Sequence, residues 1–455
     1  MRCFRLSVVV IASLALSLNA AEKSAEPKPN AQITEVVREI SPKNIEATIR
    51  KLVTFGTRHT LSDASSETRG IGAARRWIQS EFERYSKDSG RRLQVTMDEF
   101  TQPPGARNPL PAQLVNVVAT LPGTQPESRD RIYVVSGHYD SRVTDVMNAT
   151  ADAPGANDDA SGVAAVLEMA RVMSKRNWDA TLVFMAVAGE EQGLLGATHW
   201  ARMAKEKNWN VAGMITNDII GSSHADDGTV DDKHVRLFAE GVPHVREVPD
   251  GLRTLMQTGG ENDSTSRELA RFIKSTAEMH GPAMAVNVVY RRDRYLRGGD
   301  HSPFLDAGYP AVRFTEPNED FRHQHQDLRK EGEVQMGDLP EFCDFEYIAN
   351  VARVNAAALG VLSLGPSVPE EVKVETKELT NSTTLRWRAN SEPDTAGYQI
   401  VWRETTAPFW QNSAMAGNVT EFTVPKVSKD NFLFGVCAVD RDGNSSPAVY
   451  PAPLR

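Results

Sequence analysis

Two adjacent glutamates, Glu190 and Glu191, lie between glycines directly after an apolar run of the sequence. Other side chains that could bind metal or transfer protons are spread over the chain: His138, Asp140, Asp158, Asp218, His323 and His325. Zinc in catalytic sites takes imidazole nitrogen and carboxylate oxygen, and it keeps one position open for water. The residue types therefore predict a hydrolase that binds two zinc ions.

We predict that Asp158 bridges the two ions, because a pair of metals needs a shared carboxylate. In this assignment one zinc takes His138 and Asp218, and the other takes Glu191 and His323. Each of these residues alone is more typical of a turn or a solvated surface. Together, after apolar runs and beside glycines, they favour a metal site.

Glu190 is left without a metal in this assignment. We expect it to act as the general base on the water that bridges the ions, and later to pass the proton to the leaving amine. Asp140 follows His138 by two residues and can accept the ring N–H that the metal does not use, which fixes the tautomer.

The elements that would position these residues alternate between strands and helices. Strand-like runs cover 93–100, 114–121, 132–136, 180–188 and 214–220, and helical patterns cover 41–53, 68–85, 162–175, 195–207 and 268–279. This alternation predicts a three-layer α/β/α sandwich with a mixed, largely parallel central sheet. His138, Glu190 and Asp218 lie at or near strand ends, where open α/β sheets bind their ligands.

The chain divides at a Gly- and Pro-containing segment, 364–369. Beyond it short strands and turns predict a small all-β sandwich over 364–455. We assign 34–363 to the catalytic domain, 22–33 to a flexible leader and 1–21 to a signal peptide. The signal predicts a secreted or periplasmic protein. No other stretch approaches the length of an apolar membrane span, so no membrane anchor is expected.

The net charge of −9 over 455 residues argues against nucleic acid as a partner. Beyond the signal, the two cysteines Cys343 and Cys437 fall in different predicted domains, so a disulfide between them is not expected. The absence of a Cys-x-x-Cys pair also disfavours zinc held by cysteine.

The motifs Gly-His-Tyr-Asp-Ser, Asn-Asp-Asp-Ala-Ser-Gly and Gly-Glu-Glu-Gln-Gly resemble the secreted bacterial double-zinc aminopeptidases of the leucyl-aminopeptidase type. The resemblance covers about residues 40–362. It implies two Zn²⁺ per chain, peptide substrates and the same ligand and base positions, with a cis peptide between Asp158 and Asp159. The segment after residue 369 resembles a fibronectin type III domain, a module that can contact protein or carbohydrate surfaces.

Part of the resemblance is less regular. In the family the last ligand usually precedes an aspartate by four positions, which selects His323 before Asp327, although spacing alone also allows His325. Asp300 and His301 resemble a segment near the family's substrate pocket, and we expect them to support substrate binding. Tyr295 is a candidate to hydrogen-bond the oxyanion.

Three alternatives stay open at the level of sequence. A carboxypeptidase or dipeptidase of the same fold would need cations for the substrate carboxylate, and four arginines cluster before Asp300: Arg291, Arg292, Arg294 and Arg297. A glutaminyl cyclase would use one zinc. A non-catalytic receptor of this fold should have lost metal ligands, whereas all five predicted ligand positions carry a residue that can bind metal. The polar insertion 222–262 is predicted to be a surface loop, and a pocket lid or a calcium site are the alternatives.

Overall fold

An eight-stranded mixed sheet forms the centre of the larger domain in the computed structural model, which describes residues 29–243, 247–281 and 284–454. The strand order is β1-β2-β4-β3-β5-β8-β6-β7. The bounds are β1 Gln94–Gln102, β2 Ala112–Leu121, β3 Arg131–His138, β4 Thr181–Val187, β5 Asn210–Asn217, β6 His234–Ala239, β7 Ala285–Val289 and β8 Ala311–Thr315. The pairs β3–β4, β3–β5, β5–β8 and β6–β7 are parallel, and the other three are antiparallel.

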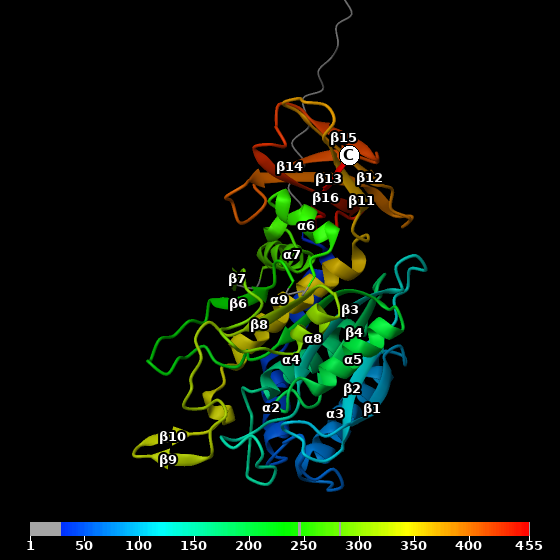
Figure 1. Ribbon diagram of the computed structural model, residues 1–455. Helices are drawn as coiled ribbons and strands as arrows, with labels where there is room; N and C mark the ends of the chain where they lie inside the picture. The colour runs from blue at the N-terminus through cyan, green and yellow to red at the C-terminus, as the bar shows by residue number, and fades with distance from the viewer. Residues whose placement is uncertain (1–28, 244–246, 282–283, 455) are drawn as a thin grey trace, which may run out of the picture.

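Helices cover both faces of this sheet, as Figure 1 shows, so the predicted three-layer sandwich is confirmed. The helices are α1 Ala31–Glu39, α2 Pro42–Val53, α3 Gly70–Asp88, α4 Ala160–Met173, α5 Leu195–Glu206, α6 Asp250–Gln257, α7 Thr265–His280, α8 His301–Asp306 and α9 Phe345–Leu364. A small hairpin, β9 Arg329–Glu331 and β10 Val334–Met336, lies outside the main sheet. Helix α1 begins at Ala31, so the predicted leader 22–33 ends inside a helix; the predicted signal 1–21 lies outside the described residues.

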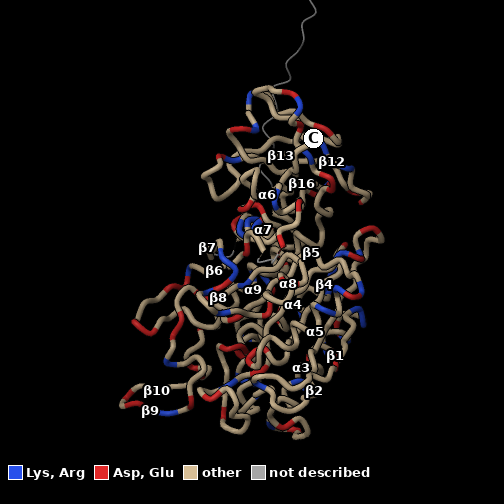
Figure 2. Tube along the Cα trace, in the orientation of Figure 1, with Lys and Arg blue, Asp and Glu red and all other residues tan. Residues whose placement is uncertain are grey.

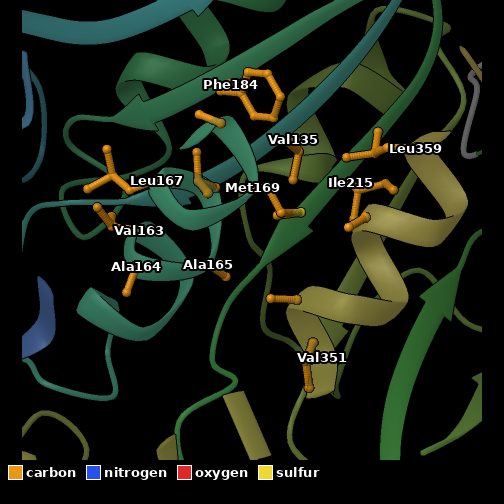
Figure 3. Packing of buried hydrophobic residues seen from close by; sticks show 14 of the residues in the cluster. Val135, Val163, Ala164, Ala165, Leu167, Met169, Phe184, Ile215, Val351 and Leu359 are labelled. Carbon is orange, nitrogen blue, oxygen red and sulfur yellow. The ribbon is translucent and has the colours of Figure 1, made fainter. Parts of the chain in front are cut away.

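The core has two parts because successive side chains of a strand point to opposite faces. Leu182 and Phe184 of β4 belong to the larger cluster with α4 and α9, whereas Val183 and Met185 belong to the cluster that contains Trp200 of α5. Figure 3 shows Phe184 within the larger cluster, together with labelled residues of α4 and α9. This two-sided packing fixes the strand register and therefore the positions of the loops at the strand ends.

Helix α9 was not predicted from the sequence, and it corrects the expectation that no further stretch approaches the length of a membrane span. Its 20 residues are apolar enough to cross a membrane, but 83% of the apolar window is buried within the fold. Helix α9 contacts α1, α4 and α7. Only its first turns carry a polar face, with Glu346, Asn350 and Arg353, and the rest is buried, so it lacks the continuous one-sided periodicity by which a surface helix is recognised.

The C-terminal domain is a sandwich of two sheets, β15-β12-β11-β17 and β14-β13-β16. Their strands pair antiparallel except for β11 and β17, which are parallel. Its strands are β11 Glu370–Glu375, β12 Thr383–Arg388, β13 Thr395–Glu404, β14 Asn412–Gly417, β15 Glu421–Val424, β16 Phe432–Asp440 and β17 Ala452–Leu454. Trp387, Tyr398 and Phe434 lie in its core. Acidic and basic residues are interspersed over both domains (Figure 2). Cys343 and Cys437 are free thiols.

A buried ion network joins the two domains. Arg403 of the sandwich donates to both carboxylate oxygens of Asp263 at 2.8 and 2.9 Å, and Arg271 of α7 contacts the same carboxylate at 3.1 Å. Trp410 of the sandwich donates to Glu268 of α7 at 3.0 Å. The side chains of Arg403 and Asp263 are almost completely buried. The sandwich is therefore joined to α7 and to the segment before it through buried charged groups.

Replacing Arg403 should destabilise the protein more than replacing an exposed arginine of the same domain. Arg403→Ala leaves the buried Asp263 carboxylate short of one partner, and breaking a buried pair of this kind costs about 3–5 kcal/mol. Arg386, whose pair with Glu421 is half exposed, is the matched control, since such pairs contribute about 0–1 kcal/mol. Calorimetry should show a melting temperature that is several degrees lower for Arg403→Ala, and an unchanged melting temperature for Arg386→Ala. Equal melting temperatures for the two variants would contradict this role.

Candidate metal centre

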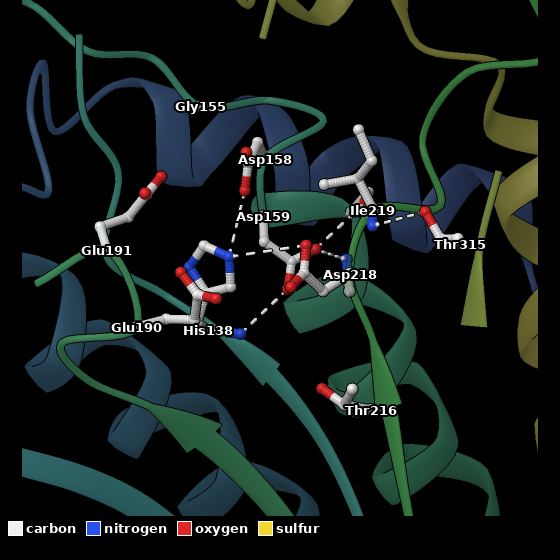
Figure 4. A network of polar contacts seen from close by, with 12 residues as sticks. His138, Gly155, Asp158, Asp159, Glu190, Glu191, Thr216, Asp218, Ile219 and Thr315 are labelled. Atoms are coloured by element: carbon white, nitrogen blue, oxygen red, sulfur yellow. Dashed lines mark hydrogen bonds and ion pairs between the residues drawn. The ribbon is translucent and has the colours of Figure 1, made fainter. Parts of the chain in front are cut away.

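The predicted ligands converge at the carboxyl ends of β3, β4 and β5. His138 is the last residue of β3, Glu190 and Glu191 follow β4, and Asp218 follows β5. Asp158 lies in the loop that leads into α4 (Figure 4). Neighbouring parallel strands end at one edge of the sheet, so residues far apart in sequence meet there.

The first group of possible metal ligands consists of His138, Asp158 and Asp218, all buried. The His138 Nε2 atom lies 3.1 Å from Asp158 Oδ1 and 4.0 Å from Asp218 Oδ1. One nitrogen and two carboxylate oxygens that face each other at this spacing are suited to zinc.

The second group consists of Asp158, Glu191 and His325. The His325 Nε2 atom lies 2.8 Å from Asp158 Oδ2 and 3.0 Å from Glu191 Oε1. The two oxygens of Asp158 therefore face different groups. A carboxylate shared in this way is what a pair of neighbouring metal ions requires.

The structure corrects the choice of His323. Its ring stacks on Phe342, with ring centroids 3.6 Å apart, and its Nδ1 atom lies 3.3 Å from Asp320. His325 has φ 57°, a left-handed conformation, and its side chain reaches Asp158 and Glu191 instead. Histidine tolerates this conformation better than most residues. The spacing of the histidines in the sequence does not predict this backbone conformation, and so it does not predict which histidine reaches the site.

The two histidines offer a matched pair of variants. We expect His325→Ala to lose at least one zinc per chain after dialysis against a zinc buffer, because the second group then keeps two carboxylates and no nitrogen. His323→Ala should keep the wild-type zinc content, since His323 belongs to neither group. Elemental analysis by mass spectrometry measures both. Zinc loss from the His323 variant with retention by the His325 variant would reverse the assignment.

The charge of the site fits divalent cations. Burial opposes the charge of His325, but Glu191 and Asp158 nevertheless raise the pKa of its imidazole to about 10. The same balance, with Asp140 and Asp158 as partners, holds the pKa of His138 well above its ordinary value. Without metal, the carboxylates therefore draw protons onto both rings. Metal ions would displace these protons, as zinc does when it binds imidazole.

Asp140 holds the glutamate loop as well as the histidine. Its carboxylate accepts the backbone N–H groups of Gly189 at 3.0 Å and Glu191 at 3.1 Å, and the hydroxyl of Thr60 at 2.8 Å. The His138 Nδ1 atom lies 3.2 Å from the Asp140 carbonyl oxygen and 3.6 Å from its carboxylate. The predicted contact with the His138 ring is present, but the closer partner is the carbonyl oxygen.

Glu190 presents a carboxylate that makes no hydrogen bond or ion pair with the described residues. It is half-buried and lines a cavity next to both metal groups. Burial, together with the nearby carboxylates of Asp218 and Glu191, raises its pKa well above the ordinary range. An unpaired carboxylate with a raised pKa, beside the predicted metals, is suited to general-base work.

The loop that carries Asp158 is fixed by Asp338, which the sequence did not single out, and by Arg58. Asp338 accepts the backbone N–H groups of Asn157 and Asp158 at 2.8 and 2.7 Å. Arg58 is buried and donates to the carbonyl oxygens of Tyr139 and Gly155 at 2.7 and 2.9 Å. The peptide bond from Asp158 to Asp159 is cis, as the resemblance predicts.

Helix α4 begins unusually close to the sheet because of a glycine. Asp159 caps the helix by accepting the N–H of Gly162 at 2.9 Å. A Cβ atom on Gly162 would lie 2.1 Å from the carbonyl oxygen of Asn217, directly before Asp218. Only glycine allows this approach, which brings Asp158 and Asp218 together.

Three predicted substrate residues do not line the cavity. Tyr295 is 80% exposed and stacks with Arg291 outside the cavity lining, so the structure does not bring it together with the other predicted site residues. His301 is buried with its Nε2 atom 2.8 Å from the Arg292 carbonyl oxygen. Asp300 is also buried, and burial and neighbouring carboxylates raise its pKa to about 7. Asp300 and His301 therefore support the site from behind the cavity wall.

The insertion 222–262 is not a plain surface loop. It contributes β6 to the main sheet, and it also contains α6. Asp231 contacts His234 Nδ1 at 2.9 Å, and neither residue belongs to the two groups of possible metal ligands.

Taken together, an α/β sandwich with His, Asp and Glu side chains converging at its strand ends defines a zinc-dependent peptide hydrolase. Residues 116–334 match the model of "Peptidase family M28". A "probable zinc metalloprotease" of Leptosphaeria maculans is 52% identical over 427 residues, covering 94% of this chain and 98% of the relative. One of Pyricularia oryzae is 50% identical over 434 residues, covering 93% and 85%.

Solved structures share the fold at low identity. An aminopeptidase from Aneurinibacillus covers 72% of this chain and 95% of its own, with a TM-score of 0.51 and 15% identity. The LapA aminopeptidase of Legionella pneumophila covers 80% of both chains, with a TM-score of 0.51 and 18% identity. The chain belongs to peptidase family M28. The two curated relatives are fungal, whereas the resemblance in the sequence was to bacterial enzymes.

Proposed function

We propose that this protein is a two-zinc exopeptidase that removes amino-terminal residues from peptides. The observation that carries the proposal is the position of Asp158, whose two oxygens face separate groups of ligands. His138 and Asp218 would complete one zinc site, and Glu191 and His325 the other. Zinc held there supplies a Lewis acid for the scissile carbonyl and lowers the pKa of water.

The protein's own residues perform the proton transfers in this proposal. Glu190 accepts a proton from the attacking water and returns it to the leaving amine. Asp140 keeps both Glu190 and Glu191 in place through their loop, because it accepts the N–H groups at its start. Glu190 is thus placed by the fold without any competing partner in the described part of the chain.

Peptides that differ only at their ends test the exopeptidase assignment. Zinc-loaded enzyme should cleave tri-leucine with a free amino terminus and leave the amino-acetylated peptide intact, with free leucine released first. Removal of zinc by a chelator should abolish the cleavage, and added zinc should restore it. Cleavage of the blocked peptide alone would overturn the aminopeptidase assignment while leaving the peptidase intact.

A carboxypeptidase or dipeptidase remains a second candidate because of one observation. Arg294 and Arg297, two of the four clustered arginines, line the cavity beside the metal groups. The others do not: Arg291 stacks on Tyr295, and Arg292 pairs with Glu240 and Asp306. Release of the carboxy-terminal residue from the acetylated peptide would support this second candidate.

We also propose that the chain is exported and that its C-terminal sandwich is of the fibronectin type III kind. The charged start and apolar run of residues 1–21 support export. The two sheets and the core of Trp387 and Tyr398 support the domain type. Amino-terminal sequencing of protein recovered from culture medium tests the export.

A further inference from the structure

The cavity next to the metal groups is lined by five arginines. It has a volume of about 380 Å³, and its guanidinium groups come from Arg107, Arg142, Arg294, Arg297 and Arg313. Its carboxylates are Asp158, Glu190, Glu191 and Asp218, each of them a proposed ligand or the proposed base. With His325 neutral and all four carboxylates ionised, the lining carries one net positive charge, and two zinc ions would raise this to five.

The charge of Arg313 in this lining is balanced by two carboxylates of the protein. Arg313 lies 2.9 Å from the Asp218 carboxylate and 2.9 Å from that of Asp293. It is fully buried, and it fixes the orientation of Asp218. Arg313 was not singled out from the sequence, because an arginine within an apolar strand gives no sign of its partners.

Two further arginines of the lining share one carboxylate with a third arginine. Arg294 and Arg297 share the carboxylate of Glu319, at 3.0 and 2.6 Å, with Arg236 at 3.3 Å. Arg294 also contacts Asp293. Three guanidinium groups thus surround one glutamate, which leaves positive charge uncompensated on this wall of the cavity.

Arg142 is the least satisfied of the five. Its side chain is 17% exposed, and within the described residues it makes no hydrogen bond. Its buried Nε atom has no hydrogen-bond partner among the described residues. The nearest carboxylate is that of Glu191, at 3.7 Å, a proposed zinc ligand. A buried N–H group without a hydrogen-bond partner costs free energy unless a ligand supplies an acceptor.

We infer that this cavity recognises a carboxylate of the peptide substrate, and that Arg142 is its main donor with Arg297 in support. The inference rests on the proposed peptidase function and does not depend on which end of the peptide is released. A planar guanidinium binds carboxylate with two parallel hydrogen bonds, so the match is geometric as well as electrostatic. The carboxylate is either the substrate's carboxyl terminus or an acidic side chain.

Four peptides separate these two sources: Leu-Leu-Leu and Leu-Glu-Leu, each with a free or an amidated carboxyl terminus. Wild-type enzyme should cleave the carboxylate-bearing peptides with the higher kcat/KM. Arg142→Ala should lower kcat/KM for those peptides by roughly 10- to 100-fold, the size of a lost hydrogen bond to a charged group. The amidated tri-leucine should be cleaved at nearly the wild-type rate. A loss confined to free termini assigns the carboxyl terminus, and a loss confined to glutamate peptides assigns the side chain.

Arg202→Ala is the matched control, because Arg202 on α5 is 68% exposed and lies outside the cavity lining. Its four rates should equal those of wild type. Arg142→Lys should recover part of the loss by keeping the charge without the two-pronged geometry. Zinc content and circular dichroism of each variant show whether the site and fold are intact.

Binding provides a readout that does not need turnover. Calorimetric titration of zinc-loaded Glu190→Gln protein with the same four peptides should show tighter binding of the carboxylate-bearing ones, and adding Arg142→Ala should remove the difference. Equal binding of all four peptides before and after the Arg142 change would overturn the inference. A wild-type enzyme that cleaves none of them would count against the proposed function, and the titration would still decide the role of Arg142.

Discussion

Glu190→Gln is expected to lower kcat by about 10²–10⁴-fold while two zinc ions stay bound, because glutamine keeps the shape of the side chain but cannot accept the proton. Glu190 belongs to neither group of ligands, so metal affinity should change little. Turnover of tri-leucine and elemental analysis of the same preparation measure the two quantities together.

The adjacent glutamate is the natural comparison. Glu191→Gln should lose zinc as well as activity, because Glu191 contributes a carboxylate to the second group. If Glu190→Gln lost zinc and Glu191→Gln kept it, the roles of the two glutamates would be exchanged.

Asp158→Ala should have the largest effect of any single change at the site. Its carboxylate faces His138 at 3.1 Å and His325 at 2.8 Å, and it also accepts from Gln324 at 3.0 Å. Removing it leaves each group with one nitrogen and one carboxylate. We expect both zinc ions to be lost and kcat/KM to fall at least about 10³-fold, since a metal contributes several kcal/mol to the transition state.

Asp152→Ala controls for the removal of an acidic residue from the same loop. Asp152 is 58% exposed and pairs with Arg69, away from both ligand groups. Its zinc content and activity should match wild type. Retention of two zinc ions by the Asp158 variant would show that the metals do not share this residue.

Much of the larger domain could be predicted from the sequence, because β2, β3 and β4 are short apolar runs, and helical patterns follow both β3 and β4. Parallel strands end at one edge of a sheet, so the pattern of residues alone predicts that His138, Glu190 and Asp218 meet there. The cis bond and the role of Asp158 followed from the resemblance and the motif around it.

The errors have a common physical origin in tertiary structure. His325, and not His323, belongs to the second ligand group. Residue 325 has a left-handed backbone conformation, which the spacing of residues in the sequence does not predict. Helix α9 was missed because most of its length is buried and apolar, which leaves little amphipathic pattern. The arginines of the cavity come from four separate segments of the chain, so their common surface appears only after folding.

Zinc-edge anomalous diffraction from crystals of the metal-loaded protein tests the shared carboxylate most directly. Two peaks are expected, one between Asp158, His138 and Asp218 and the other between Asp158, Glu191 and His325. A single peak, or a pair that does not include Asp158 as a common neighbour, would contradict the proposed metal centre.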